Sequence, residues 1–269
     1  MNKTILITGS TDGIGRLTAI KLANKGYTVY VHGRSQEKIR TTINEIKEAT
    51  GNQNIKGFIA DYSDLNSVEK MAEEINEKVA KLDVLINNAG VFNTSKIKNQ
   101  DGLDIRMVVN YLAQYLLTAR LLPLLNKGTD PRVINLSSAA QAPVSIDVLL
   151  GKETVSNGET YAQSKLALTM WTFYMAKKEP NISMIAVNPG SLQNTKMVQK
   201  AYGTSWSSPD KGATILSELS NIEDAIKISG KYFDNDRGNF GNAHPDSYDD
   251  AKIKKLIETT DELIKKLIG

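Results

Sequence analysis

The chain contains no cysteine, and histidine occurs only twice, as His32 and His244. The lack of cysteine excludes disulfides, thiolate catalysis and cysteine-ligated zinc. With only two histidines, neither a catalytic triad nor a histidine-rich metal site is expected. The sequence therefore predicts no metal site, and its chemistry must depend on other side chains.

An excess of charge of one sign and a long apolar run are also missing. The 269 residues carry 33 basic and 30 acidic side chains, a formal net charge of +3, which favours neither nucleic acid nor an anionic membrane as a partner. No apolar run approaches the ~20 residues needed to span a bilayer, and no signal-peptide pattern precedes the first strand-like run. We therefore expect a cytoplasmic protein without a membrane segment, and the Lys-, Asn- and Ile-rich composition is typical of AT-rich bacterial genomes.

Short apolar runs alternate with helical patterns along most of the chain. The expected strands lie at about 5–7, 27–31, 56–60, 84–86, 132–136 and 182–187, and the expected helices at about 14–24, 35–49, 65–81, 103–125 and 159–178. This alternation predicts an α/β fold, a doubly wound parallel sheet in three α/β/α layers. We expect one domain over residues 1–269, with a substrate-loop region at about 191–230 and a C-terminal amphipathic helix at about 247–268.

A glycine-rich turn follows the first expected strand, with the sequence Thr8-Gly9-Ser10-Thr11-Asp12-Gly13-Ile14-Gly15. Glycine lets the backbone turn tightly and approach a pyrophosphate, and the N-terminus of the next helix offers N–H groups and a partial positive charge. The spacing G-x-x-x-G-x-G differs from the common G-x-G-x-x-G. An ordinary tight turn between a strand and a helix therefore remains the alternative.

The end of the second expected strand bears on the choice of cofactor. Gly33 occupies the position where a carboxylate would pair with the ribose 2′-OH of NAD, and the guanidinium of Arg34 can grip a 2′-phosphate. NADP is therefore favoured, with NAD as the alternative. Asp12 would repel such a phosphate, and Arg34 on its own is equally typical of a solvated surface charge. Asp61, at the end of the third strand, is a candidate acceptor for the adenine amino group or a turn cap.

The pattern Tyr-x-x-x-Lys occurs three times, as Tyr161/Lys165, Tyr174/Lys178 and Tyr248/Lys252. A phenol is a poor acid at neutral pH, and lowering its pKa by ~3 units requires roughly 4 kcal/mol of stabilisation of the phenolate. A lysine four residues later on a helix lies on the same face, and its ammonium can supply that stabilisation. Position along the fold has to select the pair that does chemistry.

Together these motifs resemble the short-chain dehydrogenase/reductase family, and in particular its retinol-dehydrogenase-like branch. The matching elements follow the family's order over roughly residues 4–195: Thr8-Gly9-x-x-x-Gly13-Ile14-Gly15, Asp61, Asn87-Asn88-Ala89-Gly90, Asn110, Ser138, Tyr161-x-x-x-Lys165 and Asn188-Pro189-Gly190. The branch is indicated by Gly33-Arg34, by the 23 positions from Ser138 to Tyr161, and by Gly230-Lys231-Tyr232-Phe233. The resemblance selects Tyr161/Lys165 as the reactive pair.

The resemblance implies a Rossmann-type fold and an oxidoreductase that transfers hydride between a nicotinamide cofactor and a carbonyl or alcohol. The implied catalytic residues are Tyr161 as proton donor, Lys165 as its activator and a ribose ligand, Ser138 as a donor to the substrate oxygen, and Asn110 as the holder of a water. The implied cofactor-binding residues are Thr8, Gly9, Ser10, Asp12, Gly13, Ile14, Gly15, Arg34, Asp61, Tyr62, Asn88, Ala89, Gly90, Tyr161, Lys165, Pro189, Gly190, Leu192, Asn194 and Thr195.

The sequence departs from the family pattern after Pro189-Gly190, where the usual threonine position holds Asn194 and Thr195 comes one residue later. Either side chain is a candidate contact for the nicotinamide carboxamide. The substrate pocket is expected from residues 139–159 and 191–228, and their apolar content favours a largely apolar, small to medium substrate. Core packing is the alternative for those apolar residues: Val144, Ile146, Val148, Leu149, Leu150, Leu192, Met197, Val198, Tyr202 and Trp206.

Alternatives remain open for the partners and for the function. Relatives often pair through two long helices, here 103–125 and 159–178, so a homodimer or homotetramer is expected unless the tail helix packs on its own subunit. A non-catalytic dinucleotide sensor or scaffold is the main alternative function, although such a protein would be expected to lose Tyr161 or Lys165. A nucleotide-sugar epimerase or dehydratase is less favoured, because those enzymes use G-x-x-G-x-x-G at the first turn.

Overall fold

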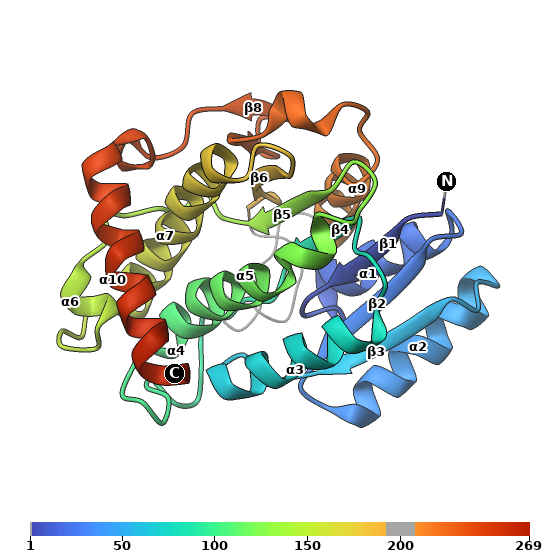
Figure 1. Cartoon of the computed structure of the whole chain (residues 1–269), viewed down its shortest axis with the longest axis horizontal. Helices are drawn as coiled ribbons and strands as arrows, with labels where there is room; N and C mark the ends of the chain where they lie inside the picture. Colours follow the sequence, from blue (N-terminus) through green and yellow to red (C-terminus); the bar gives the residue numbers. More distant parts are fainter. Residues whose placement is uncertain (1, 192–207) are drawn as a thin grey trace.

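A mostly parallel sheet of eight strands lies at the centre of the molecule (Figure 1). The computed structural model describes residues 2–191 and 208–269. The strand order is β3-β2-β1-β4-β5-β6-β7-β8, and only β8 runs antiparallel to its neighbour. The strands are β1 (Thr4–Ile7), β2 (Thr28–Gly33), β3 (Ile55–Ile59), β4 (Val84–Asn87), β5 (Arg132–Leu136), β6 (Ser183–Asn188), β7 (Lys231–Asp234) and β8 (Asn239–Gly241). The six predicted strands are confirmed, and β7 and β8 are additional.

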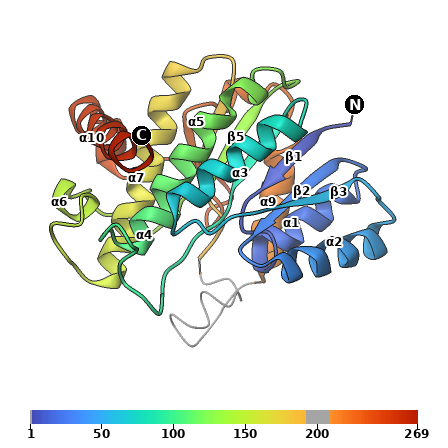
Figure 2. The same cartoon turned by 60° about the horizontal axis from the view of Figure 1, so that its bottom comes forward.

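Helices cover both faces of the sheet, which confirms the three-layer, single-domain prediction (Figures 1 and 2). One face carries α1 (Gly13–Ala23), α2 (Gln36–Thr50) and α9 (Pro209–Leu219). The other carries α3 (Leu65–Lys78), α5 (Ala113–Leu125) and α7 (Asn157–Lys178). Shorter helices are α4 (Ile105–Met107), α6 (Ile146–Leu149), η2 (Ala225–Ile228) and η3 (Pro245–Tyr248), and α10 (Asp250–Ile268) ends the chain.

Strand β1 shows why the sheet is buried on both sides. Its side chains alternate between two hydrophobic clusters: Leu6 packs under α3, α5 and α7, whereas Ile5 and Ile7 pack under α1, α2 and α9. All three are essentially inaccessible to solvent. A strand covered on both faces reads as a continuous apolar run, which is the pattern that predicted the parallel sheet.

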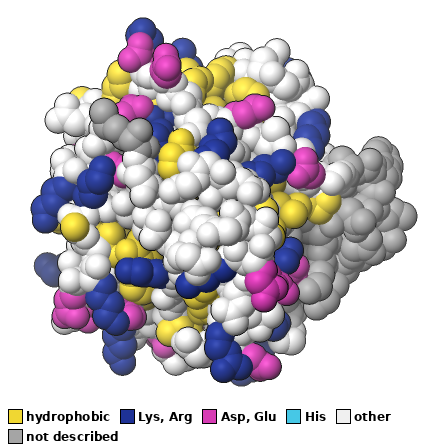
Figure 3. All heavy atoms as spheres, turned by 90° about the vertical axis from the view of Figure 1, so that its right-hand side faces the viewer, with side chains coloured by type: hydrophobic (Ala, Val, Ile, Leu, Met, Phe, Trp, Pro, Cys, Tyr) yellow, Lys and Arg dark blue, Asp and Glu magenta, His cyan; other side chains and the backbone are white. Residues whose placement is uncertain are grey.

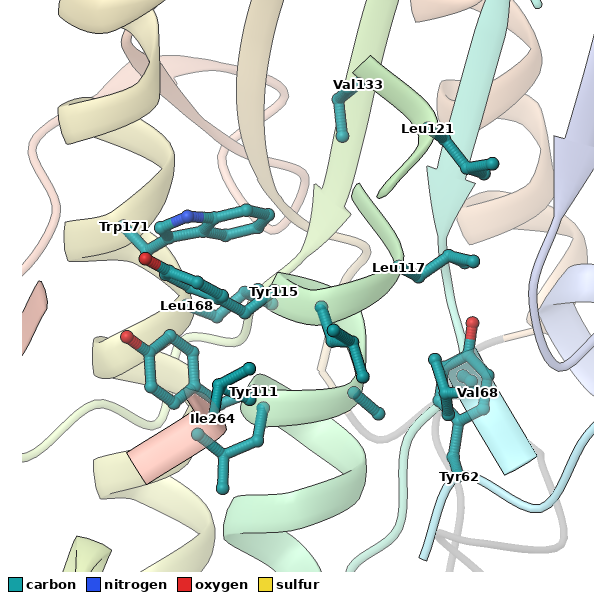
Figure 4. Close-up of a cluster of buried hydrophobic side chains, with 14 of the residues drawn as sticks. Tyr62, Val68, Tyr111, Tyr115, Leu117, Leu121, Val133, Leu168, Trp171 and Ile264 are labelled. Carbon is teal, nitrogen blue, oxygen red and sulfur yellow. The ribbon is translucent and has the colours of Figure 1, made fainter. Parts of the chain in front are cut away.

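Residues Ile105–Leu125 form one continuous helix, made of α4, the π-helical turn η1 (Val108–Leu112) and α5. By length and composition it could cross a membrane, contrary to the expectation that no apolar run is long enough, but 78% of its apolar window is buried inside the fold. Figure 4 shows this burial, with the Tyr115 ring 5.3 Å from Trp171 of α7 and 6.0 Å from Tyr111. Pro123 lies within the helix rather than ending it.

The C-terminal helix α10 packs on its own subunit, against α7 and α3 (Figure 1). The hydroxyl of Tyr111 shares a 2.8 Å hydrogen bond with Thr260, and the hydroxyl of Tyr115 donates to Asp261. Ile264 contributes to the cluster in Figure 4. The alternative in which the tail helix packs on its own subunit is therefore the arrangement in this fold. Pairing of subunits through the two long helices stays a prediction.

Charges of both signs are interspersed on the face drawn in Figure 3, as the near-balanced composition predicts. Some of the surface charges pair across elements. Arg16 of α1 lies 2.7 Å from Glu45 of α2, and Lys21 lies 2.9 Å from Asp210 of α9. Exposed pairs of this kind contribute about 0–1 kcal/mol each, so they add little to the stability supplied by the two clusters.

Candidate active site

The carboxyl ends of the parallel strands meet at one edge of the sheet, and polar side chains tie these ends together. The Asn88 side-chain amide, after β4, donates to the carbonyls of Thr8 and Gly9 at 2.7 and 2.9 Å. The Thr8 hydroxyl accepts hydrogen bonds from the N–H groups of Asn88 and Ala89, both at 3.0 Å. Asn87 donates below them to Asn135 of β5 at 2.8 Å. Asparagine amides therefore link the ends of β1, β4 and β5.

The backbone conformation or close neighbours require each of the three glycines in the first turn. Gly9 and Gly13 have φ of +62° and +54°, in the left-handed region that favours glycine. A Cβ on Gly9 would lie 2.8 Å from the Cα of Ala89, and a Cβ on Gly15 would lie 2.5 Å from the amide nitrogen of Asn88. The turn therefore presses directly against the end of β4.

The start of α1 fits the phosphates of a dinucleotide. Asp12 caps the helix by accepting a hydrogen bond from the Gly13 N–H at 2.9 Å. Over the part of the chain that the structure describes, the N–H groups of Ile14 and Gly15 have no backbone acceptor, as is usual in the first turn of a helix. Such N–H groups and the helix dipole bind anionic phosphate.

His32 is a part of this site that sequence reasoning missed. Its Nδ1 accepts a hydrogen bond from the Gly9 N–H at 3.0 Å, so Nε2 carries the proton and donates to the Ala60 carbonyl at 3.2 Å. Burial lowers the pKa of His32 to about 4, which keeps the ring neutral at pH 7. Ser10 adds to this contact, because its hydroxyl donates to Ile7 O and accepts from the His32 N–H. The available signal was a histidine near the end of the second strand, because the carboxyl ends of parallel strands share the edge where the glycine turn lies.

The residues expected around the adenosine differ in their surroundings. Arg34 is exposed, and within the described residues no hydrogen bond or ion pair engages it. The Asp61 carboxylate accepts from the N–H and hydroxyl of Ser63 at 2.9 and 2.8 Å, which makes it a turn cap. The Tyr62 side chain is buried, 4.6 Å from the His32 ring, and burial raises the pKa of Tyr62. Tyr62 thus supports His32 from the core.

Helix α7 presents both members of the predicted reactive pair. Lys165 is only 4% exposed, and its Nζ lies 5.6 Å from the centroid of the Tyr161 ring. Nζ donates a 2.6 Å hydrogen bond to the Leu136 carbonyl at the end of β5. Burial lowers the pKa of Lys165 to about 8. An ammonium has three donors, so two remain for a ligand such as a ribose.

The other two Tyr-x-x-x-Lys pairs lie away from this edge. Lys178 Nζ is 5.7 Å from the Tyr174 ring, nearly the same geometry as in the reactive pair, but Lys178 is exposed at the far end of α7. Tyr248 is 52% exposed, and Lys252 pairs with Asp246 at 2.8 Å. The spacing is the same in all three pairs, but only in Tyr161/Lys165 is the lysine buried near the glycine turn.

Asn110 lies in the π-helical turn η1, and its side chain is fully engaged with protein groups. Its amide donates to Ser164 Oγ and to the Val91 carbonyl, both at 3.0 Å, and its oxygen accepts from the Val91 N–H at 2.8 Å. A Cβ on Gly90 would lie 3.4 Å from the Asn110 oxygen and 3.6 Å from Lys165 Nζ. Asn110 therefore holds the segment after β4 beside Lys165, and the implied water stays a prediction.

Phe92 is a second residue that sequence reasoning missed. Its ring lies 4.9 Å from the Tyr161 ring, at an interplanar angle of 59°. Arg106, buried in α4, donates to the Phe92 carbonyl at 3.3 Å and pairs with Asp104 at 2.8 Å. Phe92 follows Asn87-Asn88-Ala89-Gly90 by two positions, and that closeness was the only signal in the sequence.

Ser138 follows β5 and is half-buried. Its Oγ accepts a 3.1 Å hydrogen bond from the Ala140 N–H, so the hydroxyl also caps a turn. The Ser138 carbonyl accepts from the Gln141 amide at 2.9 Å and from the Tyr232 hydroxyl at 3.1 Å. A hydroxyl that accepts in this way keeps its own proton for donation to a substrate oxygen.

The loop after β6 is held by the turn between β7 and β8. Asp236 accepts from the N–H and hydroxyl of Ser191 at 2.8 and 2.6 Å and from Asn188 at 2.8 Å. Asn235 donates to the Pro189 carbonyl at 2.8 Å. Gly190 has φ of +112°, a conformation that L-residues rarely adopt. Several predicted residues of the cofactor or substrate region lie outside the described residues: Leu192, Asn194, Thr195, Met197, Val198, Tyr202 and Trp206.

The segment between Ser138 and Tyr161 is mostly exposed or partly buried, and two of its apolar residues belong to the core. It contains α6, in which Val148 and Leu149 are buried in the cluster under α7. Four partly buried residues of the segment pack against that cluster: Val144, Ile146, Leu150 and Val155. The alternative of core packing therefore holds for Val148 and Leu149, and a pocket-lining role for the other apolar residues of the segment stays a prediction.

Comparison with known proteins agrees with this geometry. A family model described as short chain dehydrogenase matches residues 3–205. The chain belongs to the short-chain dehydrogenase family. It is 31% identical to human retinol dehydrogenase 13 over 252 residues, covering 86% of this chain and 76% of that protein. Human retinol dehydrogenase 11 is 32% identical over 244 residues, with 86% and 76% covered. The retinol-dehydrogenase-like branch is thereby confirmed.

Solved structures of other short-chain dehydrogenases share the fold. One from Escherichia coli, complexed with NADPH, has a TM-score of 0.72 at 28% identity and covers 87% of this chain and 97% of that chain. Another from Shigella flexneri, complexed with NADP, has a TM-score of 0.70 at 30% identity, with 87% and 98% covered. This short-chain dehydrogenase thus has the Rossmann-type α/β fold that the resemblance implied.

Proposed function

We propose that this short-chain dehydrogenase transfers hydride between NADP and a carbonyl or alcohol on a largely apolar substrate of small to medium size. The observation that carries the proposal is the buried Lys165 ammonium, 5.6 Å from the Tyr161 ring, at the edge of the sheet where the glycine turn also lies. Ligands of open parallel sheets bind at this edge. In this proposal the substrate oxygen would face the Tyr161 hydroxyl, and the substrate carbon would face the nicotinamide.

Tyr161 is the proton donor in this proposal. NADPH, when bound, supplies the hydride. Negative charge then develops on the substrate oxygen, and the Tyr161 hydroxyl gives it a proton. The ammonium of Lys165 stabilises the phenolate through space, because little water surrounds a side chain that is 4% exposed. Lowering the phenol pKa by ~3 units in this way is worth roughly 4 kcal/mol.

Neighbouring side chains position the reacting groups. The Ser138 hydroxyl donates to the substrate oxygen. Gln141 and Tyr232 hold Ser138 in place by hydrogen bonds to its backbone carbonyl. The ring of Phe92 packs at 4.9 Å on the ring of Tyr161 and limits its rotation. Preorganised donors of this kind contribute because they need no reorientation as charge develops.

The preference for NADP rests on the end of β2. The N–H groups of Ile14 and Gly15 would bind the pyrophosphate, and the exposed guanidinium of Arg34 would bind the 2′-phosphate. Gly33 offers no carboxylate to a ribose 2′-OH. The complexes of the Escherichia coli and Shigella flexneri proteins with NADPH and NADP support the same choice.

A screen of aldehydes, ketones and secondary alcohols, followed by the absorbance of the reduced cofactor, tests the function. With a substrate in hand, Tyr161→Phe is expected to lower kcat by at least about 10³-fold, while NADPH binding, measured by fluorescence titration, changes less than about threefold. Tyr174→Phe, on the same helix, is the matched control and should keep full activity. Substantial turnover by Tyr161→Phe would remove Tyr161 from the mechanism, and tight NADPH binding without any turnover would favour a sensor.

A further inference from the structure

The backbone conformation of Gly33, the last residue of β2, does not require glycine. Its φ is not positive, so its conformation is open to any residue. A Cβ at this position would nevertheless lie 2.7 Å from Thr11 Cγ2 and 3.1 Å from Thr11 Oγ1. Carbon contacts of 2.7 Å do not occur in relaxed proteins, because packed carbon atoms stay about 3.5–4.0 Å apart. Thr11 therefore excludes every side chain from position 33.

Thr11 has little freedom to give way. The residue before it, Ser10, is held by its N–H to the His32 carbonyl at 2.9 Å and by its hydroxyl to Ile7 O at 2.7 Å. Asp12, the residue after it, caps α1. A β-branched side chain is also stiff at χ1 and carries two γ atoms, so rotation replaces one close contact with another. Thr11 Cβ would lie 3.5 Å from a Cβ at position 33, an ordinary van der Waals contact, so only the two γ atoms of Thr11 cause the clash.

The contact between Thr11 and position 33 lies at the strand end that meets the ribose 2′ group, which is a hydroxyl in NAD and a phosphate in NADP. A carboxylate at the end of this strand is the group that pairs with the 2′-OH of NAD. The exposed guanidinium of Arg34, one residue later, suits a 2′-phosphate instead. We propose that Thr11 is a specificity-determining residue, which keeps position 33 free of a carboxylate and so leaves the ribose 2′ position to Arg34. The proposal rests on the nicotinamide-dependent function proposed above, and it adds that selection against NAD is steric and built into the glycine turn.

The steric part can be tested without any cofactor, by thermal unfolding. Gly33→Ala should lower the unfolding midpoint by about 5 °C, as expected when a methyl group overpacks a well-packed site in a protein of this size. In a Thr11→Ala background, the same Gly33→Ala change should lower it by less than about 2 °C, because both γ atoms are gone. Equal losses in the two backgrounds would overturn the proposed contact.

The specificity part is tested by binding of NADH and NADPH, measured by fluorescence titration. Gly33→Asp alone should weaken NADPH at least about tenfold without improving NADH. Combining Gly33→Asp with Thr11→Ala should tighten NADH about tenfold relative to Gly33→Asp alone, because the carboxylate can then take its place. Thr11→Ala alone completes the cycle and provides the reference affinities.

Thr11→Val provides the matched control, since valine keeps the γ branch in nearly the same volume. Gly33→Asp combined with Thr11→Val should bind NADH no better than Gly33→Asp alone. If Gly33→Asp alone already gains NADH as strongly as the Thr11→Ala combination does, Thr11 does not determine specificity. If the unaltered protein binds neither nucleotide, the proposed function fails, whereas the unfolding experiment still decides whether Thr11 blocks position 33.

Discussion

Among the residues that the structure describes, buried charged side chains are paired at one edge of the parallel sheet, and a buried lysine is unpaired at the other. At the amino-terminal edge, Asp83 accepts hydrogen bonds from the N–H groups of Thr4 and Thr129 at 2.7 and 2.6 Å and pairs with Lys81 at 2.9 Å. Arg132, at the same edge, donates to two carbonyls at 2.9 Å and pairs with Asp130. At the carboxyl edge, Lys165 is just as buried, yet within the described residues no carboxylate pairs with it.

The paired charges at the amino-terminal edge support the fold, whereas Lys165 at the carboxyl edge, unpaired among the described residues, is available for chemistry. Removing one partner of a paired buried charge is strongly destabilising, whereas a buried charge without a partner is itself destabilising unless its pKa shifts. The pKa of Lys165 falls to about 8 because burial disfavours its ammonium. The fold therefore tolerates a destabilised charge at the edge where ligands bind, which is where strain and perturbed pKa values tend to gather.

Removing Lys165 has the largest expected effect on activity. Lys165→Met should lower kcat/KM by about 10³-fold, because in the proposed mechanism its ammonium contributes roughly 4 kcal/mol of stabilisation to the phenolate in the transition state. The matched control is Lys178→Met on the same helix, whose ammonium lies at almost the same distance from a tyrosine ring but is exposed. It should change kcat/KM by less than about twofold. Similar losses in both variants would mean that burial is irrelevant to the pair.

Removing Asp83 should have the largest effect on stability. Asp83→Ala removes a buried carboxylate that accepts from the N–H groups of Thr4 and Thr129 and pairs with Lys81, so the free energy of unfolding should fall by about 4 kcal/mol. Activity per folded molecule should stay unchanged, because Asp83 lies at the opposite edge from Tyr161. Denaturant unfolding measures the first quantity and titrated active protein the second. Asp147→Ala, which removes an exposed carboxylate on α6, should be within about 0.5 kcal/mol of the unaltered protein.

The pH dependence of stability measures the penalty on Lys165 directly. Its folded pKa of about 8 lies below the usual 10.5, so between these values the unfolded chain binds more protons and stability rises with pH. Relative to Lys165→Met, the unaltered protein should gain about 3 kcal/mol of unfolding free energy as pH rises from 8 to 10.5. Denaturant unfolding of both proteins across this range makes the comparison. Parallel stability curves would show that Lys165 pays no burial penalty.

The layers of the fold could be predicted from the sequence, because alternating apolar runs and helical patterns are local properties. Strand β7 was missed because Lys231–Asp234 is short and mixed in polarity, and its strand conformation depends on pairing with β6. Helix α9 was missed because the whole of 191–230 was assigned to a substrate loop. The π-helical turn at Asn110 carries no local signal, since it arises where the helix meets Val91 and Ser164.

The candidate site was predictable as a set of residue types and not as a set of contacts. Tyr161, Lys165 and the glycine turn stand out through their order along the chain. By contrast, the hydrogen bond from Gly9 to His32 and the approach of Thr11 to Gly33 join residues about 20 positions apart across two strands. Such contacts follow from register and packing, which no local pattern specifies.

The smallest expected effect concerns Asp236, which lies at the rim of the carboxyl edge. Burial opposes its ionisation, but hydrogen bonds from Ser191 and Asn188 lower the pKa of Asp236. Asp236→Asn would place an amide against these donors, loosen the loop around Gly190 and raise the Kd for NADPH about threefold, a small effect because the carboxylate is exposed. Asp224→Asn, which breaks an exposed ion pair with Lys227, is the matched control and should leave the Kd unchanged. If the two variants bind NADPH equally well, the β7–β8 turn does not position the loop around Gly190 for cofactor binding. The residues that bind the cofactor would then be those buried behind this turn.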